Sequence, residues 1–309
     1  MSDGGGTASR SAKLRRRERR TAWAMVLPAV GVVALVALFP LAWTAWESMH
    51  LHDLRMPWRG RPFVGLANYV ELFSDSRFRE AVGHTAFFVA VTVPLELGLG
   101  LVLALGLDQI RRGRGLARVL VLLPWAVPTA VAALVWRFMF EGEGGVANQL
   151  LLGVGLLGDP LVWFADSVMA WVPVLLADVW KMTPFVTLLL LAGLQNIPQA
   201  LYEAARMDGA GGWQRFREIT LPLLRPALLV TLLFRTLDAL RVFDLVYVLT
   251  GGGPGTATEP LSLFAFDALL QGLRFGYGSA ISMTVFLIAF LFALAYVRFL
   301  GHADLMERG

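Results

Sequence analysis

Two apolar stretches of this chain carry charged side chains at helical spacing. In the stretch 227–249 (ALLVTLLFRTLDALRVFDLVYVL) cations and anions alternate at every third position: Arg235, Asp238, Arg241 and Asp244. Burying one charge at the centre of a membrane helix costs roughly 2.5–3.5 kcal/mol, so four charges need a reason. Two interpretations stay open. Residues three apart can neutralise each other or pair with a partner chain, or this face binds a polar solute through guanidinium and carboxylate hydrogen bonds.

A second polar stripe lies in the stretch 168–194. Asp178, Lys181 and Phe185, with Met182 beside them, follow one another at steps of three and four residues. This spacing places them on one face of a helix. Pro184 removes a backbone hydrogen bond and is expected to bend that helix, as is common where a helix lines a cavity.

A third feature is a polar segment, 195–225, between two apolar stretches. Pro198 precedes a good helical run at 200–207, Gly209, Gly211 and Gly212 interrupt it, and a second helical run follows at 213–219. Proline favours helix starts and glycine favours sharp turns, so we predict a helix, a turn and a helix on the membrane surface. One interpretation is a plain amphipathic connector.

The composition indicates which elements hold these residues. Of 309 residues, 57% are hydrophobic and only 16% are charged, which favours an all-α membrane protein over a soluble domain. Six stretches are long enough to cross about 30 Å of hydrocarbon. We predict six transmembrane helices, the first retained and not a signal peptide, at 23–48, 81–107, 119–140, 168–194, 227–250 and 278–300.

Charge distribution and rare residues exclude other classes. With no cysteine and four scattered histidines, the chain has no disulfide, thiol nucleophile or metal-ligand spacing. The net charge of +4 comes from cations at the ends of apolar stretches, which is typical of topology signals and not of nucleic-acid binding. The positive-inside rule puts both termini and the segment 195–225 in the cytoplasm. We expect the basic tail 1–22 to be disordered and to contact lipid headgroups, and 301–309 to be a short tail.

At the polar segment the residues resemble a known family. The spacing of Glu203, Ala204, Ala205, Gly209, Ile219, Leu221 and Pro222 is similar to the EAA loop of importer permeases of the ATP-binding cassette (ABC) class. The resemblance implies the type I ABC importer permease fold. It also implies that this loop, with Asp208, forms a coupling helix that docks on a separate ATPase subunit.

Four further stretches resemble the sugar-permease branch of that family: 63–78 (FVGLANYVELFSDSRF), 122–140 (LLPWAVPTAVAALVWRFMF), 243–258 (FDLVYVLTGGGPGTAT) and 275–282 (FGYGSAIS). Together they are similar to the first permease subunit of maltose/trehalose-type importers in the bacterial inner membrane. The resemblance implies a second permease subunit, two ATPase subunits and an extracytoplasmic sugar-binding protein. No phosphate-binding GxxxxGK[ST] motif occurs, so ATP and Mg are expected on partner subunits, with no enzyme activity or cofactor in this chain. We divide the chain into a first helix with outer loop (23–80) and a permease core (81–300).

The same resemblance implies a substrate site near the bilayer midplane, between the fourth and fifth helices. Its positions match Asp178, Lys181, Met182, Phe185, Arg235, Asp238, Ala239 and Val242. Relatives carry mainly amides and aromatics on the fifth helix, whereas Arg235 and Asp238 stand here, which leaves the sugar open. The alternatives are a permease for another polar solute such as glycerol phosphate, and an ion-coupled secondary transporter that uses the buried charges as a relay.

Overall fold

The fold is a bundle of long apolar helices. A computed structural model describes residues 21–110 and 112–306, which place most of the predicted tail 1–22 outside the described part. Among the described residues, five helices are long and apolar enough to span a membrane, and a sharply bent pair forms a sixth. The prediction of six spans is therefore confirmed when the bent pair counts as one. The five continuous spans are Thr21–Glu47 (which ends in α2, Phe39–Glu47), α4 (Ser76–Gln109), α8 (Trp171–Gln195), Gly212–Ala239 and Phe275–Arg298 within α14 (Phe275–Met306).

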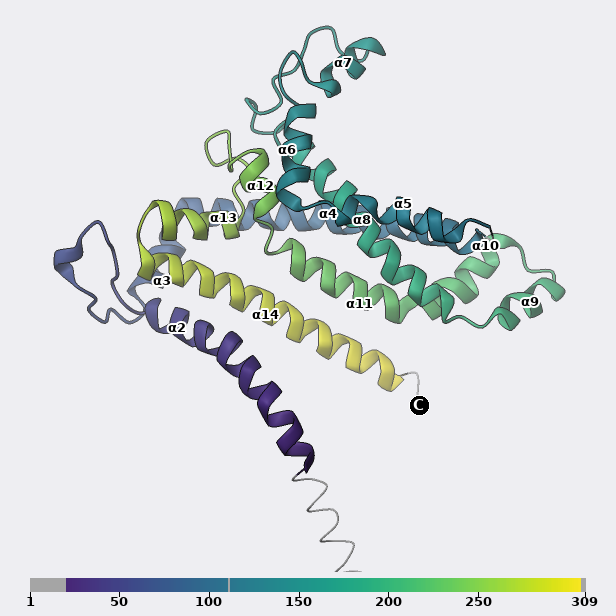
Figure 1. Cartoon of the computed structure of the whole chain (residues 1–309), viewed down its shortest axis with the longest axis horizontal. Coiled ribbons are helices and arrows are strands. Elements are labelled where there is room, and N and C mark those ends of the chain that lie inside the picture. Colours follow the sequence, from purple (N-terminus) through teal and green to yellow (C-terminus); the bar gives the residue numbers. More distant parts are fainter. Residues whose placement is uncertain (1–20, 111, 307–309) are drawn as a thin grey trace, which may run out of the picture.

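The centre of the bundle is α8, which packs lengthwise on α4 (Figure 1). In α8, 61% of the apolar span is buried inside this chain, against none of the first span. The helices can approach closely because Gly100 of α4 has no side chain: a Cβ there would lie 2.5 Å from Cγ1 of Val186 on α8. Two of the residues with predicted roles, Asp178 and Lys181, therefore lie on the helix whose apolar span has the largest buried share among the five continuous spans.

The third predicted span is broken. It consists of α5 (Arg114–Ala126) and α6 (Thr129–Met139), whose axes differ by 85°. The chain changes direction at Val127 and Pro128, whereas α5 continues through Pro124. Proline has no N–H to continue the helix and disfavours a helical conformation in the residue before it. Beyond the bend, α6 leads to α7 (Val146–Gly153), which stands away from the bundle in Figure 1.

The prediction of one continuous fifth helix over 227–250 is wrong. The helix α11 (Leu221–Ala239) ends inside that stretch, and a short helix, α12 (Asp244–Leu249), follows after a break at 240–243. At the break the backbone bonds shorten to three-residue spacing, from the Arg241 N–H to the Asp238 carbonyl and from the Val242 N–H to the Ala239 carbonyl. The helix also begins earlier than expected, because α10 (Gly212–Arg215) and the π-helical turn η3 (Phe216–Thr220) run directly into α11.

At the other end of the bundle, short helices close the loops: η2 (Pro57–Arg59), α3 (Ala67–Ser74), α13 (Leu261–Phe266) and the π-helical turn η4 (Asp267–Gln271). Arg77 fixes this end, since its guanidinium donates to both oxygens of Glu259 at 2.7 and 2.5 Å and to Asp267 at 2.8 Å. Burial raises the pKa of Glu259, and the hydrogen bonds from Arg77 oppose that rise. The loop between α12 and α13 is therefore tied to the start of α4.

Candidate functional site

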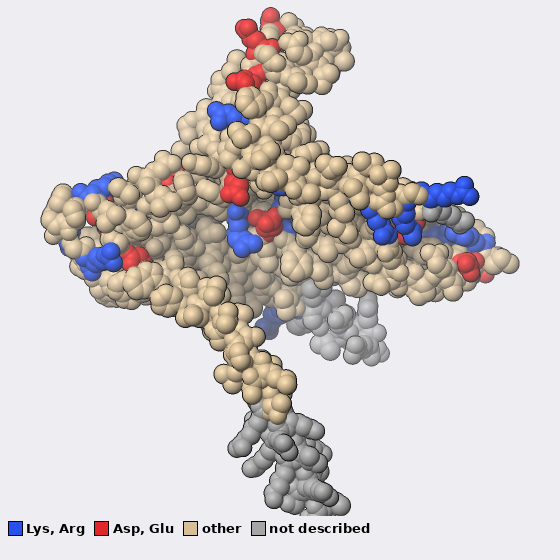
Figure 2. Space-filling view, viewed as in Figure 1, with Lys and Arg blue, Asp and Glu red and all other residues tan. Residues whose placement is uncertain are grey.

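The two helix breaks lie on one cavity. The turn between α5 and α6, the turn between α11 and α12, and the middle of α8 surround about 460 Å³. Figure 2 shows acidic and basic side chains together in the middle of this face, with uncharged surface around them. Non-helical backbone inside a membrane protein occurs where it lines a cavity or is buried in protein. The position of the two breaks at this cavity fits that rule.

Most of the residues predicted to bind substrate line this cavity. They come from α8 and from the end of α11: Asp178, Lys181, Met182, Arg235, Asp238, Ala239 and Val242. Phe185 is not among the lining residues. It lies one turn further along α8 and packs on Trp125, which does line the cavity, with ring centroids 6.0 Å apart.

Arg235 is the centre of an ionic cluster that joins three helices. Its side chain is 1% exposed, and Nε and Nη2 donate to the two carboxylate oxygens of Glu96 on α4. Nη2 also donates to Asp178 on α8, and Nη1 donates to Oδ2 of Asp238 at 3.0 Å. A buried guanidinium with this many carboxylate partners is already satisfied within the chain.

Glu96 was not predicted as a site residue. It is fully buried on α4, and its partner Arg235 stands 139 positions later in the chain. A signal was present, because Glu96 is the only Asp, Glu, Lys or Arg in the predicted span 81–107. An acid in that position needs a partner by the same argument that drew attention to the charges of the fifth helix.

The charges of the fifth helix do not form a continuous ladder. Arg235 and Asp238 pair as expected from their spacing of three residues. Arg241 is exposed, and its Nε donates to the Leu237 carbonyl at 3.2 Å. No ion pair joins Arg241 to Asp238 or Asp244 within the described residues. The self-neutralising interpretation therefore holds for the first pair, while Arg241 and Asp244 leave charged groups at the cavity wall.

Lys181 bridges α8 to the bent pair. Its Nζ donates to the carbonyl of Val127 at 2.5 Å and lies 3.5 Å from the carbonyl of Trp125. These carbonyls are at the carboxyl end of α5, where the helix lacks following N–H groups and its dipole favours a cation. The ammonium thus stabilises the bend that shapes the cavity.

Taken together, the cavity suits a polyhydroxy solute. Its wall carries three acidic and three basic side chains: Asp178, Asp238, Asp244, Lys181, Arg235 and Arg241. The side chain of Asp238 is 53% exposed, whereas that of Arg235 is nearly inaccessible. Hydroxyl groups can donate to the accessible carboxylates and accept from Arg241, and Trp125 and Phe243 supply aromatic surface for a ring.

The polar segment folds as the sequence predicts. The first helix is α9 (Gln199–Met207), and Gly209 makes the turn with φ of 80°, a conformation that glycine adopts without strain. Of the loop residues, Glu203, Ala204, Asp208 and Gly209 are exposed. The later ones, Ile219, Leu221 and Pro222, and also Ala205, are half-buried. The motif therefore has an exposed half and a half that is anchored to the bundle.

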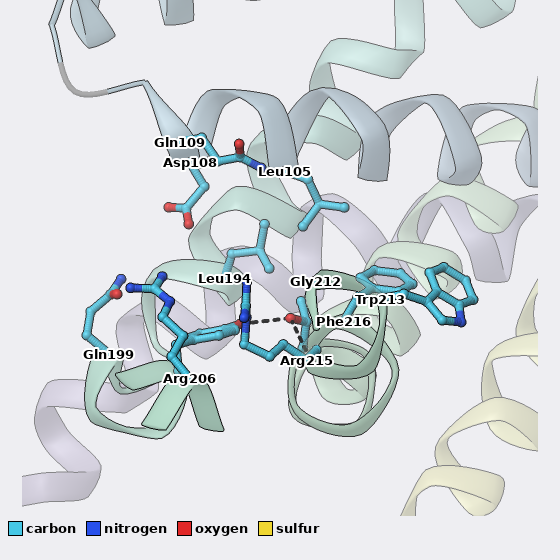
Figure 3. A pocket seen from close by; sticks show the side chains of 12 residues that line it. Leu105, Asp108, Gln109, Leu194, Gln199, Arg206, Gly212, Trp213, Arg215 and Phe216 are labelled. Carbon is cyan, nitrogen blue, oxygen red and sulfur yellow. Dashed lines mark hydrogen bonds between the residues drawn. The ribbon is translucent and has the colours of Figure 1, made fainter. Parts of the chain in front are cut away.

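Side chains brace the turn from inside. The hydroxyl groups of Tyr202 on α9 and Thr220 on η3 form a hydrogen bond at 2.9 Å. Both residues line a cavity of about 660 Å³ that also has Asp108 of α4 and Arg206 of α9 in its wall (Figure 3). Arg215 donates to the Ala210 carbonyl at 2.6 Å and closes the loop. The exposed tips are Met207 and Trp213, whose surfaces are 88% and 73% accessible. This geometry offers a rigid, protruding contact surface at the end of α8 and the beginning of α11.

Comparison with known proteins places the chain in a family. Residues 96–302 match the model of the binding-protein-dependent transport system inner membrane component. The chain is 46% identical to the trehalose/maltose transport system permease protein MalF of Thermococcus litoralis, over 93% of this chain and 96% of that protein. It is 37% identical to the trehalose transport system permease protein SugA of Mycobacterium tuberculosis, over 94% of this chain and 91% of that one.

The fold matches as well. A crystal structure of a bacterial ABC transporter involved in the import of the acidic polysaccharide alginate superimposes with a TM-score of 0.78 and 24% sequence identity, covering 93% of this chain and 98% of that one. The resemblance found at the EAA loop and the type I importer fold are thus confirmed. The chain belongs to the binding-protein-dependent transport system inner membrane components, and it is a multi-pass membrane permease subunit of an ABC importer.

Proposed function

We propose that this permease moves a neutral disaccharide, trehalose or maltose, through the cavity between α8 and the α11–α12 break. The observation that carries the proposal is the cavity wall, in which acidic and basic side chains are equal in number and accessible carboxylates lie beside aromatic rings. A sugar presents hydroxyl donors and acceptors and an apolar ring face, which match such a wall. The names of the relatives from Thermococcus litoralis and Mycobacterium tuberculosis support the same class of solute.

The charge balance argues against an anionic solute such as glycerol phosphate. Behind the balanced wall lies a further carboxylate, Glu96, so the site as a whole carries more acid than base. A phosphate would need several unpaired cations, but Lys181 and Arg235 are occupied by carbonyls and carboxylates, which leaves Arg241 of the three cations at the wall. Their occupation also leaves little for an ion relay, and the family membership speaks against a stand-alone secondary transporter.

Energy for transport is expected to come from partner chains. In this proposal α9 docks on one of two ATPase subunits, which hold ATP and Mg, and their closure moves the cavity between outward and inward access. A second permease subunit covers the open side of the cavity, and an extracytoplasmic sugar-binding protein delivers the sugar. The exposed half of the EAA loop supports this role, because it presents Glu203, Ala204 and Gly209 to a partner.

A sugar panel tests the substrate class. The complex is purified with its binding protein, and ATP hydrolysis is measured with trehalose, maltose, sucrose and glycerol 3-phosphate. Trehalose or maltose should stimulate hydrolysis, and glycerol 3-phosphate should not. Stimulation by glycerol phosphate alone would replace the disaccharide by the anionic solute.

The orientation proposal places α9 and both termini in the cytoplasm. The cations of the connections support it, and the end of α14 lies toward the α9 end of the molecule in Figure 1. Since the chain has no cysteine, single cysteines at the exposed positions Met207 and Leu54 can report the two sides. In intact cells an impermeant maleimide should label Leu54→Cys and leave Met207→Cys unlabelled until the membrane is opened. The reverse pattern would invert the topology.

Two substitutions test the predicted substrate residues. Asp238→Asn removes an accessible carboxylate, and Lys181→Met removes the ammonium that holds the α5–α6 bend while keeping the apolar stem. Hydrogen bonds that involve a charged group contribute about 1.5–3 kcal/mol, so we expect sugar uptake into proteoliposomes to fall roughly ten- to a hundredfold in each. The partner subunits should still co-purify. Unchanged uptake in both variants would show that these charges serve neither solute binding nor the shape of the cavity.

A further inference from the structure

A buried acid, Glu96, lies behind the wall of the substrate cavity. Glu96 lies on α4, fully buried, and does not line the cavity. Both of its carboxylate oxygens accept hydrogen bonds from Arg235, one from Nε and one from Nη2. Glu96, which the solute does not reach, therefore holds Nε and Nη2 of the guanidinium, and Nη1 faces Asp238.

We propose that Glu96 is a positioning residue of the substrate cavity. It fixes the plane of the Arg235 guanidinium, and through Arg235 it presents the carboxylate of Asp238 to the sugar, while Arg235 itself does not contact the sugar. The inference rests on the proposed function of the cavity. It also changes the role expected for Arg235, from a sugar ligand to the connection between a buried acid and an accessible one.

The geometry of the guanidinium supports this connection. The group is planar and rigid, so two parallel bonds to one carboxylate determine its orientation. Once Glu96 holds Nε and Nη2, the remaining nitrogen Nη1 can point in one direction only, and it meets Oδ2 of Asp238 at 3.0 Å. Asp178 on α8 accepts a hydrogen bond from Nη2 and is the third carboxylate around the guanidinium.

Accessibility separates the two residues. The Arg235 side chain is 1% exposed and that of Asp238 is 53% exposed, although both border the cavity. A sugar that bonded Arg235 directly would have to displace a carboxylate from a buried cation, which is costly in a medium of low polarity. A sugar can bind Asp238 without displacing a partner. Only Oδ2 accepts a hydrogen bond from the described residues, so Oδ1 remains for a hydroxyl group.

A double-mutant cycle distinguishes positioning from simple structural support. The complex is purified with its partner subunits but without binding protein, and its dissociation constant for trehalose is measured by saturation-transfer NMR, with maltose as second probe. Glu96→Gln keeps the shape of the side chain but removes the carboxylate that accepts two hydrogen bonds from Arg235. Trehalose should therefore bind about tenfold more weakly, as in Asp238→Asn. In the double variant the effect should stay within about twofold of Asp238→Asn alone, because both changes remove one connection.

Two further variants provide a control and an alternative to Glu96→Gln. Glu80→Gln is the same chemical change on the same helix, at an exposed position, and should leave the affinity unchanged. If Glu96→Gln reduces the yield of the complex, Arg235→Lys tests the same connection, since lysine keeps the charge but cannot donate two parallel hydrogen bonds to the Glu96 carboxylate. It should also weaken trehalose binding and show the same lack of additivity with Asp238→Asn.

The outcomes separate this inference from the proposed function. If the wild type binds trehalose or maltose and the Glu96 variant binds equally well, Glu96 does not position the site. Effects of Glu96→Gln and Asp238→Asn that multiply to about a hundredfold would show independent roles and also overturn it. A wild-type complex that binds neither sugar would overturn the disaccharide proposal, and this inference with it.

Discussion

A complex that carries Arg235→Met is expected to be less stable than the wild type by about 3–5 kcal/mol, and to unfold at a clearly lower temperature. The substitution keeps an apolar side chain of similar length but removes the cation between Glu96 and Asp178, which are 0% and 6% exposed. Two buried carboxylates would then lie close together with no counter-charge. The midpoint of thermal unfolding, followed by fluorescence-detected size-exclusion chromatography in detergent, measures the effect.

A matched control is available on the same helix. Arg241→Met is the same change at an exposed arginine whose side chain makes one backbone hydrogen bond, so its stability should stay within about 0.5 kcal/mol of the wild type. Replacing the cluster as a whole is also informative. Arg235→Met combined with Glu96→Leu and Asp178→Leu removes both buried carboxylates with the cation and leaves only the accessible Asp238 without its partner, so it should recover most of the loss in stability, although not transport. Equal melting of the Arg235 and Arg241 single variants would contradict a structural role of the cluster.

Local signals predicted the elements of the polar segment well. The expected helix at 200–207 is observed as Gln199–Met207, because Pro198 precedes its first turn and Gly209 adopts the left-handed conformation just after its end. Both signals act within a few residues, so no tertiary contact is needed to read them. The long spans were also predicted from their apolar composition. Their ends differ, as in α4, which begins at Ser76 with Asp75 as its N-cap and not at 81.

The cavity depends on contacts that the sequence alone could not specify. The break after Ala239 has no proline or glycine to announce it, since the stretch 227–250 contains neither. It forms where α12 packs against α6, and α6 reaches that place only because of the bend at Pro128. The predicted residues of α8 and α11, except Phe185, line one cavity because helical spacing fixes which side chains share a face. Glu96, the partner of Arg235 on α4, was missed because helical spacing says nothing of a second helix.

The second large effect is expected at the turn that follows α9. Gly209→Pro should leave the complex assembled, or partly weakened, while sugar uptake falls at least about tenfold relative to ATP hydrolysis. Proline fixes φ near −65°, whereas Gly209 has φ of 80° and its N–H donates to the Arg206 carbonyl at 3.1 Å. The mismatch is worth about 3 kcal/mol or more, enough to change how α9 leaves the turn.

The expected loss is specific to coupling, because the exposed half of the motif would be displaced relative to the anchored half that continues into α11. The ratio of sugar transported to ATP hydrolysed, measured in proteoliposomes, reports this directly. Gly211→Ala is the matched control: its φ of −67° suits any residue, and a Cβ there meets nothing within 4 Å. That variant should transport like the wild type, and Gly209→Ala should fall between the two, since the left-handed conformation costs alanine roughly 1–2 kcal/mol. A normal transport ratio in Gly209→Pro would mean that the turn does not carry motion from the ATPase subunits to the cavity.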